Sequence, residues 1–170
     1  MNKIRYYAGI GSRETPTELM EDIKIICYRL NDLKYTLRSG GALGADSYFE
    51  KYAFNKEIFL PWKGYCQKYG KDFRVPKLTQ EMYEIAEKYH PNWSACSDGI
   101  KAMHTRNVCQ ILGEDLKTPV DFVICWTKDG KASGGTGQAL RIAKGYGIQI
   151  FNLKNKEDLD RLQLFLNIEL

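Results

Sequence analysis

The sequence contains no apolar run near the roughly 20 residues that a membrane-spanning helix needs. Its start, Met1-Asn2-Lys3-Ile4-Arg5, lacks the apolar segment and cleavage site of a secretory signal peptide. Paired cysteine motifs are lacking as well: the five cysteines in 170 residues are widely scattered and form no C-x-x-C pair. Scattered cysteines of this kind are typical of reduced thiols that pack in a core. We therefore expect a cytoplasmic protein that does not enter a membrane.

Metal-binding patterns are also scarce. The only two histidines stand at positions 90 and 104, and no cysteine pair has the spacing of a zinc site. We expect neither a metal site nor a bound cofactor. The net charge is small too, because 25 Lys and Arg residues against 21 Asp and Glu residues leave +4. The basic residues form no long stripe along the sequence. This balance suits a small anionic ligand and makes nucleic acid the less favoured partner.

Short apolar runs alternate with amphipathic segments along the chain. This alternation predicts an α/β fold of the Rossmann-like, doubly wound class, with a mainly parallel sheet, helices on both faces and one domain over 1–170. Thr15-Pro16-Thr17-Glu18 has the form of a capping box and predicts a helix start at Thr15. Residues 61–96 break the pattern, and we expect them to form an excursion over the carboxyl edge of the sheet. The expected strands are 5–8, 35–38, 57–60, 122–126 and 149–152, and the later helices are about 45–54, 79–89, 98–112, 136–146 and a last one around 159–166.

Three glycine-bearing stretches follow predicted strands, at 9–13, 39–46 and 133–137. Glycine lets backbone N–H groups approach a phosphate, and a helix start directly after it adds the positive end of the helix dipole. Because parallel strands end at one edge of the sheet, the three loops are predicted to form one anion-binding hollow. Tight packing of strand against helix is the alternative use of the same glycines. The predicted ligand-binding residues are Gly11, Ser12, Arg13, Ser39, Gly40, Gly41, Gly44, Asp46, Asn107, Trp126, Thr127, Gly134, Gly135, Thr136 and Gly137.

The same stretches resemble the SLOG superfamily of Rossmann-like proteins. The resemblance rests on Gly9-Ile10-Gly11-Ser12-Arg13, on Ser39-Gly40-Gly41-Ala42-Leu43-Gly44-Ala45-Asp46 and on the late Gly134-Gly135-Thr136-Gly137. The superfamily includes the DNA-processing protein A family, the LONELY GUY phosphoribohydrolases and sensor-like domains that bind nucleotide ligands. The first two loops look most like the DNA-processing A type, whose members bind single-stranded DNA and load a recombinase.

The phosphoribohydrolases cleave the N-glycosidic bond of a nucleoside monophosphate with an M-x-x-R-K helix and a P-G-G-x-G-T-x-x-E loop. Met103-His104-Thr105-Arg106-Asn107 is similar to the first motif, except that Asn107 replaces the lysine. In the second motif, Gln138 replaces the threonine and Arg141 stands where the resemblance implies the catalytic glutamate. A glycosidase needs a carboxylate, so Glu14, Asp46 or Glu50 would have to substitute. Glu14, Glu50 and Arg106 are the candidate catalytic residues.

The sequence thus predicts a homo-oligomeric protein that binds a nucleotide or nucleotide-derived small molecule, as a sensor, a sequestering protein or a processing enzyme. One alternative is an N-glycosidic hydrolase of nucleoside phosphates. The other is a single-stranded-DNA-binding protein of the DNA-processing A type.

Overall fold

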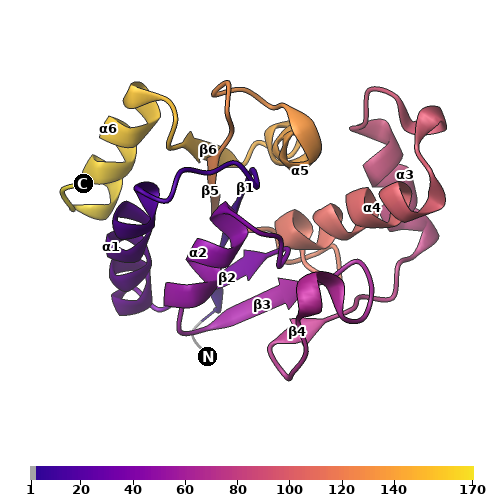
Figure 1. Cartoon of the computed structure of the whole chain (residues 1–170), viewed down its shortest axis with the longest axis horizontal. Helices are drawn as coiled ribbons and strands as arrows, with labels where there is room; N and C mark the ends of the chain where they lie inside the picture. Colours follow the sequence, from indigo (N-terminus) through magenta and orange to yellow (C-terminus); the bar gives the residue numbers. More distant parts are fainter. Residues whose placement is uncertain (1–2) are drawn as a thin grey trace.

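The computed structural model describes residues 3–170, and its centre is a six-stranded sheet in which every neighbouring pair is parallel (Figure 1). The strand order is β4-β3-β2-β1-β5-β6. This arrangement confirms the predicted Rossmann-like α/β class. The strands are β1 (Arg5–Gly11), β2 (Tyr35–Ser39), β3 (Lys56–Phe59), β4 (Phe73–Arg74), β5 (Phe122–Trp126) and β6 (Gln149–Asn152).

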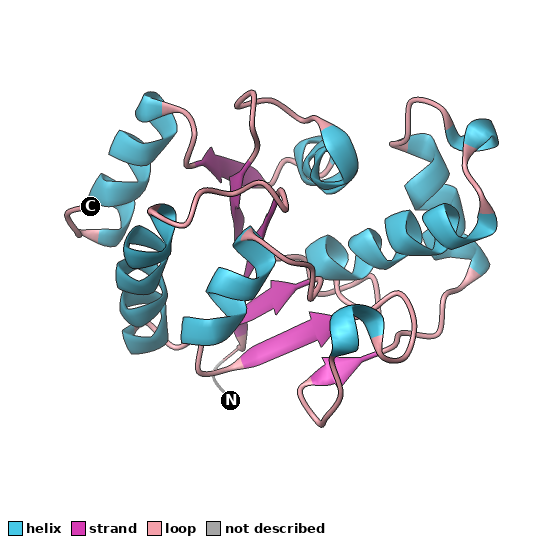
Figure 2. Cartoon of the chain, viewed as in Figure 1, coloured by secondary structure: helices cyan, strands magenta, loops and turns pink. Residues whose placement is uncertain are grey.

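Helices cover both faces of the sheet (Figure 2). One face packs against α1 (Leu19–Asp32), α2 (Ala45–Tyr52) and α6 (Lys156–Leu166). The other packs against α4 (Asp98–Leu112) and α5 (Gly134–Gly145), and α3 (Gln80–Lys88) lies against α4. Two single turns, η1 (Tyr65–Gln67) and η2 (Trp93–Ala95), complete the elements. No helix within 3–170 combines the length and apolar character that crossing a membrane demands.

The alternation of side chains along a strand divides the core into two layers. In β1, Tyr7 packs among the residues of α1, α2 and α6, whereas Ala8 packs on the opposite side with α4 and α5. All five residues of β5 are buried, as expected for a central parallel strand with helices on both sides. The apolar runs that predicted the strands are therefore explained by burial on both faces of the sheet.

The start of α1 differs from the predicted capping box. The helix begins at Leu19, and its N-cap residue Glu18 makes no side-chain capping hydrogen bond. The hydroxyl of Thr15 instead donates to the backbone oxygen of Ser12 at 2.6 Å. Thr15 thus belongs to the loop after β1, and α1 starts about one turn later than predicted.

The segment 61–96 is more ordered than its sequence pattern suggested. It contributes β4, which pairs with β3 at the sheet edge, and α3, which packs beside α4 (Figure 1). One side chain of the segment, Tyr65, reaches the cavity described below.

Candidate functional site

A cavity of about 640 Å³ opens at the carboxyl ends of β1 and β5. The two strands stay paired as far as Gly11 and Trp126, and the Ser12 N–H still donates to the Trp126 oxygen at 3.0 Å. Beyond that point their chains diverge, because α1 and α5 lie on opposite faces of the sheet. The strand order also reverses at β1, which is where doubly wound sheets form a ligand crevice.

The cavity brings together many of the predicted residues and leaves others outside. The residues from that prediction that line it are Gly11, Ser12, Arg13, Glu14, Asp46, Arg106, Asn107, Thr127, Gly134, Gly135 and Thr136. Those that do not line it are Ser39, Gly40, Gly41, Gly44, Glu50, Trp126 and Gly137.

The N-terminus of α5 opens into this cavity. The first backbone bond of the helix runs from the Gly137 N–H to the Ser133 oxygen at 2.9 Å, so the N–H groups of residues 134–136 precede the hydrogen-bonded ladder. The N-cap Ser133 makes no side-chain bond to them. A Cβ placed on Gly134 or Gly135 would meet no atom within 4 Å. Backbone donors and the positive end of the helix dipole thus face free space, as an anion site requires.

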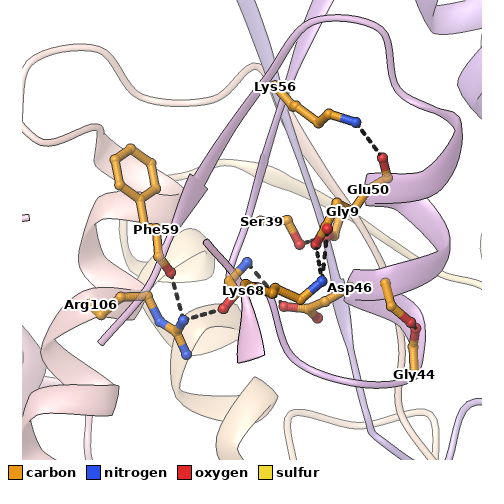
Figure 3. Close-up of polar contacts among 11 residues, drawn as sticks. Gly9, Ser39, Gly44, Asp46, Glu50, Lys56, Phe59, Lys68 and Arg106 are labelled. Atoms are coloured by element: carbon orange, nitrogen blue, oxygen red, sulfur yellow. Dashed lines mark hydrogen bonds and ion pairs between the residues drawn. The ribbon is translucent and has the colours of Figure 1, made fainter. Parts of the chain in front are cut away.

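The glycines after β2 serve packing. A Cβ on Gly40 would lie 2.2 Å from Nε2 of Gln110, and one on Gly44 would lie 2.3 Å from the Ser12 oxygen. Gly44 also has φ +81°, a conformation that favours glycine. The neighbouring Ser39 hydroxyl is directed into the fold, where it donates to the Gly9 oxygen at 2.6 Å (Figure 3). Of the two uses that the sequence left open for this loop, close packing is the one its contacts fit.

Asp46 connects the loops that follow β1 and β2. Its Oδ1 accepts the Gly11 N–H and its Oδ2 accepts the Gly40 N–H, both at 3.0 Å. Burial raises the pKa of Asp46 above its ordinary value of 3.8, against the opposing effects of Arg106 and the backbone donors. Both oxygens are therefore already occupied by the protein backbone, although the residue borders the cavity.

Arg106 forms part of the cavity wall from α4, with its side chain almost fully buried. Nη1 donates to the Phe59 oxygen at 2.7 Å (Figure 3) and to the Gly40 oxygen. Nε donates to Oδ1 of Asn107 at 3.2 Å. Burial lowers the pKa of Arg106, and the nearby Asp46 carboxylate opposes this change. Because a guanidinium has so high an intrinsic pKa, the group stays cationic and supplies a fixed positive charge.

Asn107 holds the first turn of α5 in place. Its Nδ2 donates to the Gly135 oxygen at 3.3 Å and to Oε1 of Gln138 at 3.1 Å. Gln138 in turn donates to the Ala86 oxygen of α3 at 3.2 Å. The Asn107 amide thus positions the start of α5 beside the cavity.

Arg13 and Glu14 lie at the exposed mouth of the cavity. Nη2 of Arg13 donates to the Tyr65 hydroxyl at 3.2 Å. Glu14 accepts from Nζ of Lys128 at 3.0 Å, and both partners are more than half exposed. Arg13 can swing onto a bound anion from here, whereas Glu14 is a solvated member of a weak ion pair.

Two further candidates face away from the cavity. Both carboxylate oxygens of Glu50 accept from Nζ of Lys68 at 2.7 Å, and both side chains are largely buried. The structure therefore does not bring Glu50 to the site as a substitute acid. Trp126 is 5% exposed and packs in the core on the α1 side, so it offers no stacking face to a ligand.

Position 141 contributes no acid either. The Arg141 side chain donates to the Tyr89 oxygen at 2.8 Å and to the Ala132 oxygen at 3.0 Å. It thus fastens α5 to the end of α3 and to the loop before α5.

Sequence reasoning missed several lining residues. Gln110 lies one helical turn after Arg106, and this i, i+4 spacing on α4 was a signal that could have found it. Tyr65 comes from a segment without periodicity and gave no such signal. The remaining missed lining residues are Ile10, Ala42, Met103, His104, Lys128, Asp129, Ser133 and Ala139.

Comparison with known proteins finds a solved structure that is similar to this chain. A solved structure of DNA processing protein A from Helicobacter pylori, described for its single-stranded DNA binding mode, superposes with a TM-score of 0.53 at 17% identity. The match covers 96% of this chain and 79% of that one. The two proteins share a fold. No protein-family model matches the sequence, and the search of curated proteins gives no match.

Proposed function

We propose that this chain binds a nucleotide or nucleotide-derived small molecule, with a phosphate held by the N-terminus of α5. The observation that carries the proposal is the uncapped start of that helix, where Gly134 and Gly135 leave the backbone donors uncovered beside a cavity of about 640 Å³. Cavities of this size suit a nucleotide-sized ligand.

The charges around the helix start support the same ligand. Arg106 supplies a buried cation on one wall, and Arg13 supplies an exposed one at the mouth. An arginine fork binds phosphate oxygens in two places at once, which adds orientation to attraction. Farther along the cavity, the Gln110 amide is available to a sugar or base, whereas the Thr127 hydroxyl already donates to the Lys131 oxygen and accepts from Nδ2 of Asn152.

Binding without cleavage is the form of the proposal that the side chains favour. Glycosidic hydrolysis needs an acid–base pair of carboxyl groups around the scissile bond. Of the acids lining the cavity, Asp46 already accepts two backbone N–H groups, and Asp129 accepts from the Ser133 hydroxyl at 2.7 Å. Glu14 is solvated and paired with Lys128. We therefore infer a sensor or a sequestering protein.

A thermal-stability screen over nucleotides, cyclic nucleotides and dinucleotides tests the proposal. A ligand present at 100 times its Kd stabilises the folded state by about 2.7 kcal/mol, which raises Tm by about 5–11 °C for a chain of this length. Mass spectrometry of the same mixture should then recover the ligand intact. Free base or ribose phosphate would identify an enzyme, and the absence of any shift across the panel would refute the proposal.

The second candidate is binding of single-stranded DNA, favoured by the fold shared with DNA processing protein A. An anion-receptive helix start can hold a phosphate of a strand as well as that of a nucleotide. Oligonucleotide retardation with an affinity that falls steeply with salt would support this candidate. Binding of a mononucleotide with little salt dependence would instead favour the first proposal.

A further inference from the structure

The fold gathers three metal-binding side chains outside the phosphate-facing part of the cavity. His90 follows α3, Cys96 follows η2, and His104 lies in α4. One donor atom from each lies within 4.8 Å of the other two. The two imidazole rings have centroids 4.4 Å apart, and Sγ of Cys96 is 3.7 Å from Nε2 of His90.

These separations are close to those of a tetrahedral zinc site. With Zn–S near 2.3 Å and Zn–N near 2.0 Å, two ligands of one ion lie about 3.5 Å from each other. The sulfur-to-nitrogen distance of 3.7 Å is close to this value, and because all three donor atoms lie within 4.8 Å of one another, no separation in the group exceeds it by more than about 1.3 Å. Small rotations of half-buried side chains are enough to close that gap.

One ring nitrogen in the group has no hydrogen-bond partner within residues 3–170. Nδ1 of His104 is buried and makes no hydrogen bond to the part of the chain that the structure describes. Buried polar atoms almost always have a partner, so this nitrogen is free to accept from a water or to bind an ion. By contrast, Nδ1 of His90 accepts the Asn92 N–H at 3.1 Å, and metal binding at either nitrogen of that ring breaks this hydrogen bond.

We propose that His90, Cys96 and His104 form a binding site for a zinc-class divalent cation, with water at a fourth position. Two imidazoles and a thiolate are the donors that zinc prefers, and hard cations such as Mg²⁺ select oxygen instead. The negative thiolate offsets the repulsion between the cation and the nearby guanidinium of Arg141. The cation ties the turn after α3 to α4.

The site adjoins the cavity, because His104 also lines it. The inference does not depend on the proposed nucleotide, since its ligands and its test involve the metal alone. The matched control is Cys66→Ser, which removes another half-buried free thiol away from the cluster.

The test is a titration of the chelator-treated, reduced full chain with Co²⁺ and then Zn²⁺. We expect one equivalent of Co²⁺ to give the intense visible bands of a tetrahedral site and a thiolate-to-cobalt charge-transfer band, both lost when Zn²⁺ displaces it. Cys96→Ser should abolish the charge-transfer band. His90→Gln and His104→Gln should each weaken binding by more than about 100-fold, beyond the range seen for outer-shell partners. Cys66→Ser should behave as the wild type.

A second readout is the chemistry of the thiol itself. Zn²⁺ should protect Cys96 and leave Cys66 open to alkylation, as peptide mass mapping would show. Circular dichroism of each metal-free variant separates loss of the site from loss of the fold. The proposal is overturned if the cobalt spectrum is octahedral without charge transfer, or if Cys66→Ser weakens binding as much as Cys96→Ser.

Discussion

Replacing Gly135 by valine tests the anion site at the start of α5 most directly. Gly135 is the second residue of the helix and borders the cavity, and a Cβ there meets no atom within 4 Å. A side chain at this position therefore has room for its Cβ without disturbing the fold. It occupies the space that a phosphate needs in order to reach the backbone donors.

The size of the effect follows from the bonds that the phosphate would lose. A hydrogen bond to a charged group contributes about 1.5–3 kcal/mol. Since each 1.4 kcal/mol is a factor of ten in affinity, loss of one such bond raises Kd by about 10- to 150-fold. Isothermal titration with the nucleotide that stabilises the protein most would measure this change.

Gly99→Val is the matched control. Gly99 is likewise the second residue of its helix, α4, is exposed, and has no atom within 4 Å of an added Cβ. It does not line the cavity. Both variants carry the same propensity change, so the difference between their Kd values isolates the effect at the cavity. Equal Kd values would refute the assignment of α5, and a large loss of Tm in Gly135→Val alone would show that the space beside it is not free.

Other replacements test the remaining contacts. Gly11→Ala should cost about 1–3 kcal/mol in a urea titration, because the new Cβ would lie 2.7 Å from the backbone oxygen of Trp126; an unchanged midpoint would contradict this packing. Glu50→Gln should lower stability by up to about 3 kcal/mol through the loss of the Lys68 ion pair, yet leave the nucleotide Kd unaltered. A tenfold change in Kd would return Glu50 to the site. Finally, the raised pKa of Asp46 means that the folded chain binds more protons than the unfolded chain just above pH 3.8. The protonated Asp46 side chain therefore contributes stability that is complete below pH 3.8 and is lost as pH rises through the folded-state pKa. Asp46→Asn should remove that slope from a pH series of urea midpoints, and a slope that persists would point to another group.

The sequence predicted the elements whose signals depend on burial. The runs 122–126 and 149–152 were assigned as strands and 98–112 as a helix, and β5, β6 and α4 have these bounds. Their apolar periodicity directly reflects contact with the two core layers. The start of α1 was mispredicted because Thr15 belongs to the loop after β1, where its hydroxyl donates locally to the Ser12 backbone oxygen. The two-residue strand β4 was missed because so short an element has no period.

The histidine–cysteine cluster was missed for a different reason. Sequence spacing identifies a metal site only when the ligands share one local motif, and here the histidines belong to different elements. Packing of α3 beside α4 brings positions 90 and 104 together, and the turn between the helices adds Cys96. Contacts of this kind follow from tertiary structure alone.

A glycine motif by itself does not distinguish a ligand-binding loop from a tightly packed one. Glycine is needed both where a ligand approaches the backbone and where another part of the protein does, and a sequence records only that a Cβ is missing. In the loop after β2, a Cβ on Gly40, Gly41 or Gly44 would collide with protein atoms, whereas Gly134 and Gly135 face free space. The glycines that carry the resemblance to the superfamily in that loop thus preserve the packing of strand against helix, and they would be needed whichever ligand is bound. Evidence for a ligand comes from a cavity-lining glycine that neither packing nor backbone conformation requires. Gly135 at the start of α5 is one, whereas Gly134 has φ +63°, which itself favours glycine, and Gly99 lies outside the cavity.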